Sequence, residues 1–108
     1  MERPLYDIAH ARSGDKGPNT NVGLIFNSVE AYDWSKEVIT EKKVKEHFGD
    51  VVKGEVVRYE LPNLWALNFI LQDSLYGSGS ETLQLDAKGK TYGQHLLRMV
   101  LDIPDELV

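Results

Sequence analysis

The stretch around which the chain is organised reads Arg12-Ser13-Gly14-Asp15-Lys16-Gly17-Pro18-Asn19-Thr20-Asn21. It contains no hydrophobic residue and lies between two apolar segments, Leu5 to Ala11 and Val22 to Phe26. The pattern of the flanking segments predicts a strand on each side, with His10 on the inward face of the first. The polar run is then predicted to be a loop. Loops held between strands commonly carry the chemistry of a small domain, so we expect function here.

The composition predicts one globular domain spanning residues 1–108. A net charge of -5 argues against a nucleic-acid-binding surface, which needs an excess of lysine and arginine. The chain has no cysteine, so disulfides and thiolate metal sites are excluded. It has neither the apolar region of a signal peptide nor a long apolar run, so we expect a soluble, cytoplasmic protein that does not enter membranes.

Two consecutive helices are predicted after the second strand. Ser28 is a suitable N-cap for a helix that continues to about Ile39. Thr40 is a suitable N-cap for a second helix over Glu41 to Phe48, and Gly49 is a typical helix stop. These start and stop signals indicate that the helices are short and separate.

The next segments are predicted to be a strand and an apolar helix. Residues 54–61 alternate, and the residues predicted to face inward are Val57, Tyr59 and Leu61. Asn63 is then expected to cap a helix over residues 64–71, which is apolar on nearly every face. Because one sheet covers only one side of such a helix, we expect another chain to cover Trp65 and Phe69.

The remaining segments complete a layered domain. The expected elements are a connector over 76–80, a strand over 81–85, a turn over 86–89, and a helix from residue 90 to about 100, with 101–103 as an alternative edge strand. Strands and helices in this order predict an α+β two-layer sandwich with a mixed sheet and helices on one face. The other face is a candidate dimer surface.

The polar run is a candidate anion site. Arg12 offers a planar fork for a carboxylate or phosphate, Lys16 offers a point charge, and the amides of Gly14 and Gly17 allow close approach. It is not a P-loop, because the required glycine and lysine spacing is absent. The alternative is a polar hairpin in which Asp15 accepts backbone hydrogen bonds and the glycines supply the turn.

Acid–base chemistry is a second possibility for the same segment. Lys16 or His10 would be the working group, and Asp15 would orient it. No metal site is predicted, because His10, His47 and His95 lack the spacing of ligands on one helix, and His47 is expected at the surface.

Asn68 is the one polar residue inside the predicted apolar helix. A buried amide needs partners, because an unsatisfied one costs roughly 1 to 3 kcal/mol. It either ties the helix to a neighbouring carbonyl or helps to line a pocket with Asn19 or Asn21.

Three motifs together resemble the small domain of the AtuA family, which is associated with acyclic terpene utilisation. They are the run from Leu5 to Gly17, the pair Tyr59-Glu60-Leu61-Pro62-Asn63 and Ala66-Leu67-Asn68-Phe69, and the run from Leu85 to Lys90. Pro18 is a departure, because the family pattern usually continues from Gly17 directly to asparagine.

The resemblance implies a ferredoxin-like fold and a pathway that handles branched isoprenoid acids as coenzyme A thioesters. In larger members this domain follows a much bigger one, so a larger AtuA-like protein, a homo-oligomer and an acyl-CoA are the expected partners. No cofactor is predicted. The predicted ligand-binding residues are Arg12, Ser13, Gly14, Asp15, Lys16, Gly17, Asn19 and Asn21.

Three hypotheses about function remain open at the level of sequence. The first is an accessory subunit whose polar loop completes an anionic-ligand site on the larger partner. The second is an enzyme that uses Lys16 and Asp15, with assistance from His10. The third is a purely structural homo-oligomer, in which the loop serves as scaffolding.

Overall fold

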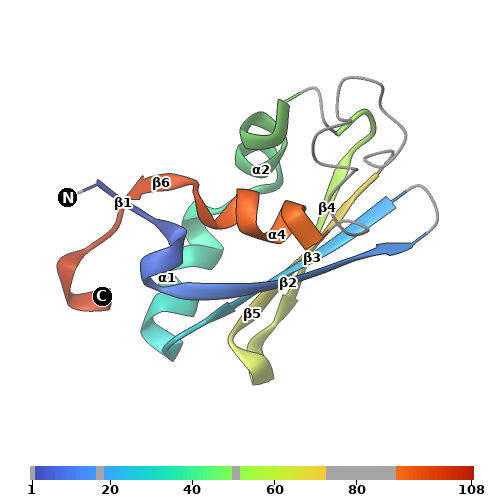
Figure 1. The fold of residues 1–108 in the computed structure, drawn as a ribbon. Helices are drawn as coiled ribbons and strands as arrows, with labels where there is room; N and C mark the ends of the chain where they lie inside the picture. Colours follow the sequence, from blue (N-terminus) through green and yellow to red (C-terminus); the bar gives the residue numbers. More distant parts are fainter. Residues whose placement is uncertain (1, 17–18, 50–51, 73–89) are drawn as a thin grey trace.

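The computed structural model describes residues 2–16, 19–49, 52–72 and 90–108 (Figure 1). Its main element is a four-stranded sheet in the order β2-β3-β5-β4. The strands are β2 (Ala9–Lys16), β3 (Asn19–Phe26), β4 (Val56–Leu61) and β5 (Ala66–Leu71). Each neighbouring pair is antiparallel, so the mixed sheet expected from sequence is wrong for the described strands.

The topology is a split βαβ unit with one extra edge strand. The chain leaves β3, passes through α1 (Val29–Val38) and α2 (Glu41–Phe48), and enters β4, while β5 lies between β3 and β4. Such a split unit is the centre of the ferredoxin-like arrangement. Helix α4 (Lys90–Leu97) packs over β2 and β3, on the side of the sheet that α1 and α2 also cover (Figure 1). The expected α+β sandwich with helices on one face is therefore confirmed.

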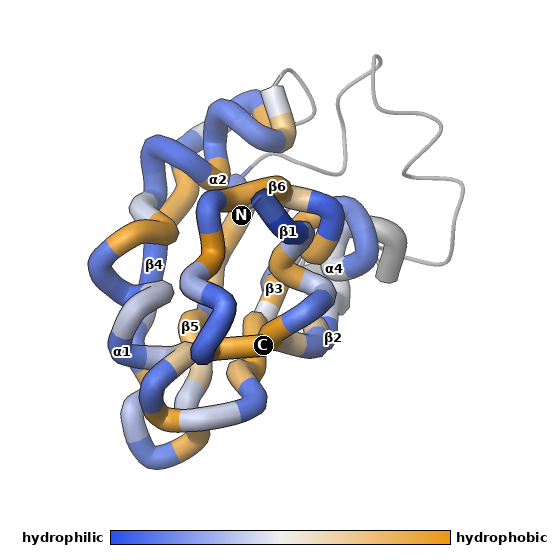
Figure 2. The backbone as a smooth tube through the Cα atoms, turned by 90° about the vertical axis from the view of Figure 1, so that its left-hand side faces the viewer, coloured by the Kyte–Doolittle hydropathy of each residue, from blue (hydrophilic) through white to orange (hydrophobic). Residues whose placement is uncertain are grey.

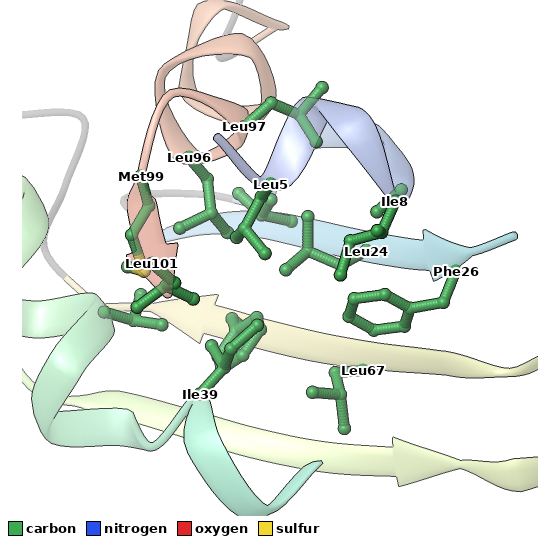
Figure 3. Close-up of a cluster of buried hydrophobic side chains, with 14 of the residues drawn as sticks. Leu5, Ile8, Leu24, Phe26, Ile39, Leu67, Leu96, Leu97, Met99 and Leu101 are labelled. Carbon is green, nitrogen blue, oxygen red and sulfur yellow. The ribbon is translucent and has the colours of Figure 1, made fainter. Parts of the chain in front are cut away.

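The core lies between the sheet and these helices. Side chains of β3 alternate between buried and half-buried, and Leu24 and Phe26 point toward the helical layer. Leu67 of β5 points into the same region, where Ile39 and Leu96 approach from the helices (Figure 3). The period of two in β3 gives one buried face and one face left free for other contacts.

The first two helices begin at the predicted caps. The Ala31 amide donates to Ser28 Oγ at 3.1 Å, and the Lys43 amide donates to Thr40 Oγ1 at 3.2 Å. Gly49 ends α2 with a φ of 60°, a conformation that favours glycine. Helix α2 is mainly hydrophilic (Figure 2), and Val44 and Phe48 are its only buried residues.

The predicted first strand and polar loop are shifted along the chain. A 3-10 helix, η1 (Leu5–Asp7), occupies the start of the predicted strand, and β2 begins only at Ala9. Most of the predicted loop belongs to the β2–β3 hairpin, in which Asp15 pairs with Thr20 and Lys16 with Asn19. The backbone of the polar run satisfies its hydrogen bonds in a strand ladder, which side-chain polarity alone does not reveal.

The predicted helix over 64–71 is wrong, because residues 66–71 form strand β5. A short 3-10 helix, η3 (Pro62–Leu64), and Trp65 in the left-handed conformation, with a φ of 52°, reverse the chain before it. Strand β5 lies between β3 and β4, and its helix-facing residues Leu67, Phe69 and Leu71 are buried. A short continuous apolar run suits a central strand as well as a helix, and periodicity does not separate the two.

The predicted orientation of β4 is also wrong. Arg58 faces the helices and donates to the carbonyls of Lys36 and Ile39, while Tyr59 and Leu61 are exposed. The carbonyls at the end of α1 need donors, so the half-buried Arg58 guanidinium takes the helix-facing position that the apolar alternation assigned to Val57 and Tyr59.

The two ends of the described chain lie side by side. Strands β1 (Glu2–Pro4) and β6 (Val100–Asp102) form a two-stranded antiparallel sheet (Figure 1). The predicted C-terminal helix is confirmed as far as Leu97, and the alternative edge strand is present as β6; a last 3-10 helix, η5 (Asp105–Leu107), follows. The connector, strand and turn predicted over 76–89 lie outside the described residues. None of the described helices is long and apolar enough to cross a membrane.

Candidate functional site

The candidate site lies on the open face of the sheet, the face opposite the helices. Directly opposed residues of an antiparallel pair share a face, so the pairings place Arg12, Gly23, Asn68 and Tyr59 in one row across all four strands. The next row toward the β4–β5 connection contains His10, Ile25, Ala66 and Leu61. Polar and apolar rows therefore lie next to each other.

A hollow of about 390 Å³ occupies the centre of this face. Sites for small molecules commonly measure about 300–1,000 Å³, so this one suits a small ligand or part of a larger one. Its lining residues come from all four strands of the sheet and from the β4–β5 connection: Arg12, Ser13, Gly14, Asn21, Gly23, Ile25, Leu61, Leu64, Ala66 and Asn68.

Three side chains on this hollow carry unused hydrogen-bonding groups. Arg12 is exposed, and neither an ion pair nor a hydrogen bond engages its guanidinium among the described residues. The side-chain amides of Asn21 and Asn68 also lack a partner within the described part of the chain. One charged fork and two amides thus line a mostly apolar hollow, an arrangement that orients a ligand while apolar contacts hold it.

The structure brings together part of the predicted ligand set. Arg12, Ser13, Gly14 and Asn21 line the hollow, although Ser13 Oγ also accepts a hydrogen bond from the Gly93 amide of α4 at 3.3 Å. Asn19 is in β3, opposite Lys16, and does not line it. Gly17 and the side chains of Asp15 and Lys16 lie outside the described residues.

Histidine 10 differs from its prediction. It was expected to face inward, but it is exposed on the open face, opposite Ile25. It does not line the hollow. The preceding 3-10 helix shifts the strand phase, so Ala9 takes the buried position instead.

Half of the residues that line the hollow were not predicted from the sequence. Gly23, Ile25, Leu61, Leu64 and Ala66 were not predicted as site residues, yet all line it. For Asn68, the pocket alternative is supported, because it shares the hollow with Asn21. Treating residues 66–71 as a strand next to β3 would have placed Asn68 beside Gly23.

The two predicted interface residues have different surroundings. Phe69 is completely buried in the chain's own core, so its prediction as an interface residue is wrong in this structure. Trp65 is 42% exposed, and its neighbour Leu64 is 63% exposed. Trp65 is also the one non-glycine residue with a positive φ in the described chain. Of the two predicted interface residues, only Trp65 is exposed enough to contact another chain.

A second polar cluster lies between α2 and α4. The rings of His47 and His95 are 4.6 Å apart, and His47 Nε2 donates to the His95 carbonyl at 2.8 Å. Burial lowers the pKa of His95, and the nearby charge of His47 lowers it further. Within the described residues, no group of three or more metal-ligating side chains gathers, at this cluster or elsewhere.

Fold and site together define an α+β ferredoxin-like domain with one helix-covered face and one open, partly polar face. The sequence matches the AtuA ferredoxin-like domain over residues 3–102, and the chain belongs to that family. No curated protein and no solved structure matches the chain. The family assignment therefore depends on a match that covers nearly the whole sequence.

Proposed function

We propose that this domain binds an anionic, partly apolar metabolite on the open face of its sheet, as an accessory component of an AtuA-like system in branched acyl-CoA metabolism. The observation that carries the proposal is the Arg12 guanidinium, which no described residue pairs, beside a hollow whose other lining is mostly apolar. Arginine matches the planar geometry of a carboxylate or phosphate, and apolar side chains accommodate an acyl tail.

The openness of the site supports an accessory role. One side of the hollow has no covering element in the described chain, and Leu64 and Trp65 expose apolar surface at its end. A larger AtuA-like protein seated on this end would exclude water from the ligand and strengthen its charged hydrogen bonds. His10 does not line the hollow, and the side chains of Lys16 and Asp15 lie outside the described residues, so no described residue specifically supports acid–base catalysis here.

Calorimetric titration tests the ligand part of the proposal. Octanoyl-CoA, octanoate and free CoA are titrated into the wild type and Arg12→Ala at two salt concentrations. We expect salt-sensitive binding of at least one acyl ligand and about tenfold or greater loss in Arg12→Ala, the effect of a hydrogen bond to a charged group. Arg98→Ala, an exposed arginine next to α4, is the matched control and should retain affinity.

Two results would contradict the proposal. Absence of binding to every ligand in a folded wild-type sample would remove the stand-alone site. Equal affinity of the wild type and Arg12→Ala would place any binding elsewhere. A second titration, of the larger AtuA-like protein into the small domain with and without octanoyl-CoA, tests the accessory role. Failure of the two proteins to associate under both conditions would contradict that role.

A further inference from the structure

Two of the described glycines have no structural reason to be glycine, and both line the hollow. A Cβ on Gly23 would meet Asn68 Oδ1 at 3.6 Å and the Arg12 carbonyl at 3.8 Å, which are ordinary contact distances. A Cβ on Gly14 would meet no atom of the described residues within 4 Å. Neither residue has a positive φ, so neither backbone conformation nor crowding requires glycine.

The other described glycines behave differently. Gly49 has a φ of 60°. A Cβ on Gly54 would come within 2.8 Å of the Gln72 side chain, and one on Gly93 would come within 3.1 Å of Ser13 Oγ, where α4 packs on β2. Each has a local reason for the missing side chain. Only the pair at the hollow is unexplained by the fold.

Glycine within a strand lowers stability, because it packs nothing and loses much conformational freedom on folding. Gly23 is in β3, a central strand, where this cost is greatest. What its missing side chain provides is exposed backbone at the base of the hollow. The space directly above Gly23 lies between Arg12 and Asn68, its two partners in register.

The dimensions of this gap limit the group that fits. Arg12 and Asn68 are two strand spacings apart, so their Cα atoms are separated by about 10 Å. Both side chains can therefore reach a planar group of a few atoms that rests on the Gly23 backbone. Asn21, opposite Gly14 in the adjacent row, adds another amide at its edge.

The residues that line the hollow also restrict the charge of the chemical group that fits there. Among the described residues that line the hollow, Arg12 is the one with a charged side chain, and the next row supplies Ile25, Ala66 and Leu61. A single guanidinium between amides suits one carboxylate, whereas a coenzyme A moiety would bring several phosphates into a site where the described residues supply one cation. The apolar row then accommodates a hydrocarbon tail that extends toward Leu64.

We infer that Gly14 and Gly23 form a seat for the carboxylate of a free monocarboxylic acid with an apolar tail, held between Arg12 and Asn68. This inference rests on the proposed function and narrows it from an anionic metabolite to a carboxylate. Ligand specificity then depends on the exposed backbone at the two glycines as well as on the Arg12 side chain.

The test compares three probes with the same tail, octanoate, octanamide and 1-octanol, by calorimetric titration into the wild type, Gly23→Ala, Gly23→Val and Gly14→Ala. We expect octanoate to bind the wild type about tenfold or more tightly than the two neutral probes, because only it makes charge-assisted hydrogen bonds with Arg12. The added alanine and valine side chains should fill the seat and weaken octanoate binding. The loss of affinity should be largest in Gly23→Val.

Weaker binding could result from a side chain that fills the seat or from a destabilised fold. Thermal unfolding of the same variants distinguishes these two causes. Gly23→Ala and Gly14→Ala should melt at or above the wild-type temperature, because alanine fits and restricts the unfolded chain. Weaker binding by a variant of equal or higher stability supports the inference. Ile70→Val, on the open face but outside the lining, is the control and should bind octanoate normally.

Failure of the inference is distinguishable from failure of the proposed function. The inference is overturned if octanoyl-CoA binds in an Arg12-dependent way while octanoate does not. It is also overturned if octanamide matches octanoate, or if both Gly23 variants keep wild-type affinity. In the first and the last of these cases the proposed anionic site stands, whereas equal binding of octanamide and octanoate also contradicts an anionic site. Loss of all binding by the wild type overturns both.

Discussion

Arg58 joins strand β4 to the end of helix α1 through one side chain. Its Nη1 atom donates to the carbonyls of Lys36 at 2.7 Å and Ile39 at 2.9 Å, where α1 ends. The side chain is only 19% exposed, although it also pairs with Glu60 at 3.2 Å. Carbonyls at a helix end need donors, so the guanidinium attaches the helical layer to edge strand β4.

Arg58→Met should therefore lower the free energy of unfolding by about 2 kcal/mol, the typical loss for hydrogen bonds to a charged group. Urea unfolding followed by circular dichroism measures this change. Glu60→Gln removes only the more exposed partner and should cost less than about 1 kcal/mol. Equal losses in the two variants would mean that the surface pair, and not the carbonyl contacts, stabilises this edge.

At the scale of elements, the contact between α2 and α4 should make stability depend on pH. Burial lowers the pKa of His95 below 6.5, and the charges of His47 and Arg98 add to this effect. Below pH 6.5 the unfolded chain then binds more protons at this residue than the folded chain does. Stability from this residue is complete above pH 6.5 and is lost as the pH falls toward the folded pKa.

Urea midpoints measured between pH 5 and pH 8 should fall on the acidic side for the wild type. The fall should be smaller in His95→Gln, which does not titrate, even if its stability at pH 8 is lower. His10→Gln, on the open sheet face, should keep the wild-type slope. An identical slope in His95→Gln would show that other groups cause the acid sensitivity.

At the scale of the whole molecule, the exposed end of the sheet is the predicted contact with another chain. Trp65 holds a large aromatic side chain in a left-handed conformation, which is costly for residues other than glycine. Such strain at an exposed aromatic residue is better explained by a contact made outside the chain than by the core, to which Trp65 contributes little.

We expect the purified domain to self-associate at high concentration, and Trp65→Glu to remain a single chain of 12.2 kDa by light scattering. A charge placed in an apolar contact opposes association. Val29→Glu, on α1 at a residue 41% exposed, is the control and should associate as the wild type does. The interface prediction is wrong if Trp65→Glu and the wild type have the same mass.

The helix ends were predictable from the sequence because the deciding interactions there are local. Ser28, Thr40 and Gly49 signal helix ends through contacts within three or four residues, and all three predictions are confirmed. Prediction from the sequence failed where distant strands decided the outcome. The apolar run 66–71 is a strand because β3 and β4 flank it, and no signal inside the run reports that pairing.

The chain's own sequence thus determined the α+β class, the first two helices with their caps, the family, and Arg12 as a candidate anion-binding residue. Only the tertiary structure decided that the polar run forms a hairpin, that Asn68 lies beside Gly23, and that Leu61 and Leu64 complete the hollow. The physical reason is the distance along the sequence between the residues that interact. Caps depend on neighbours along the chain, whereas a site on a sheet face is assembled by hydrogen bonds between strands far apart in sequence.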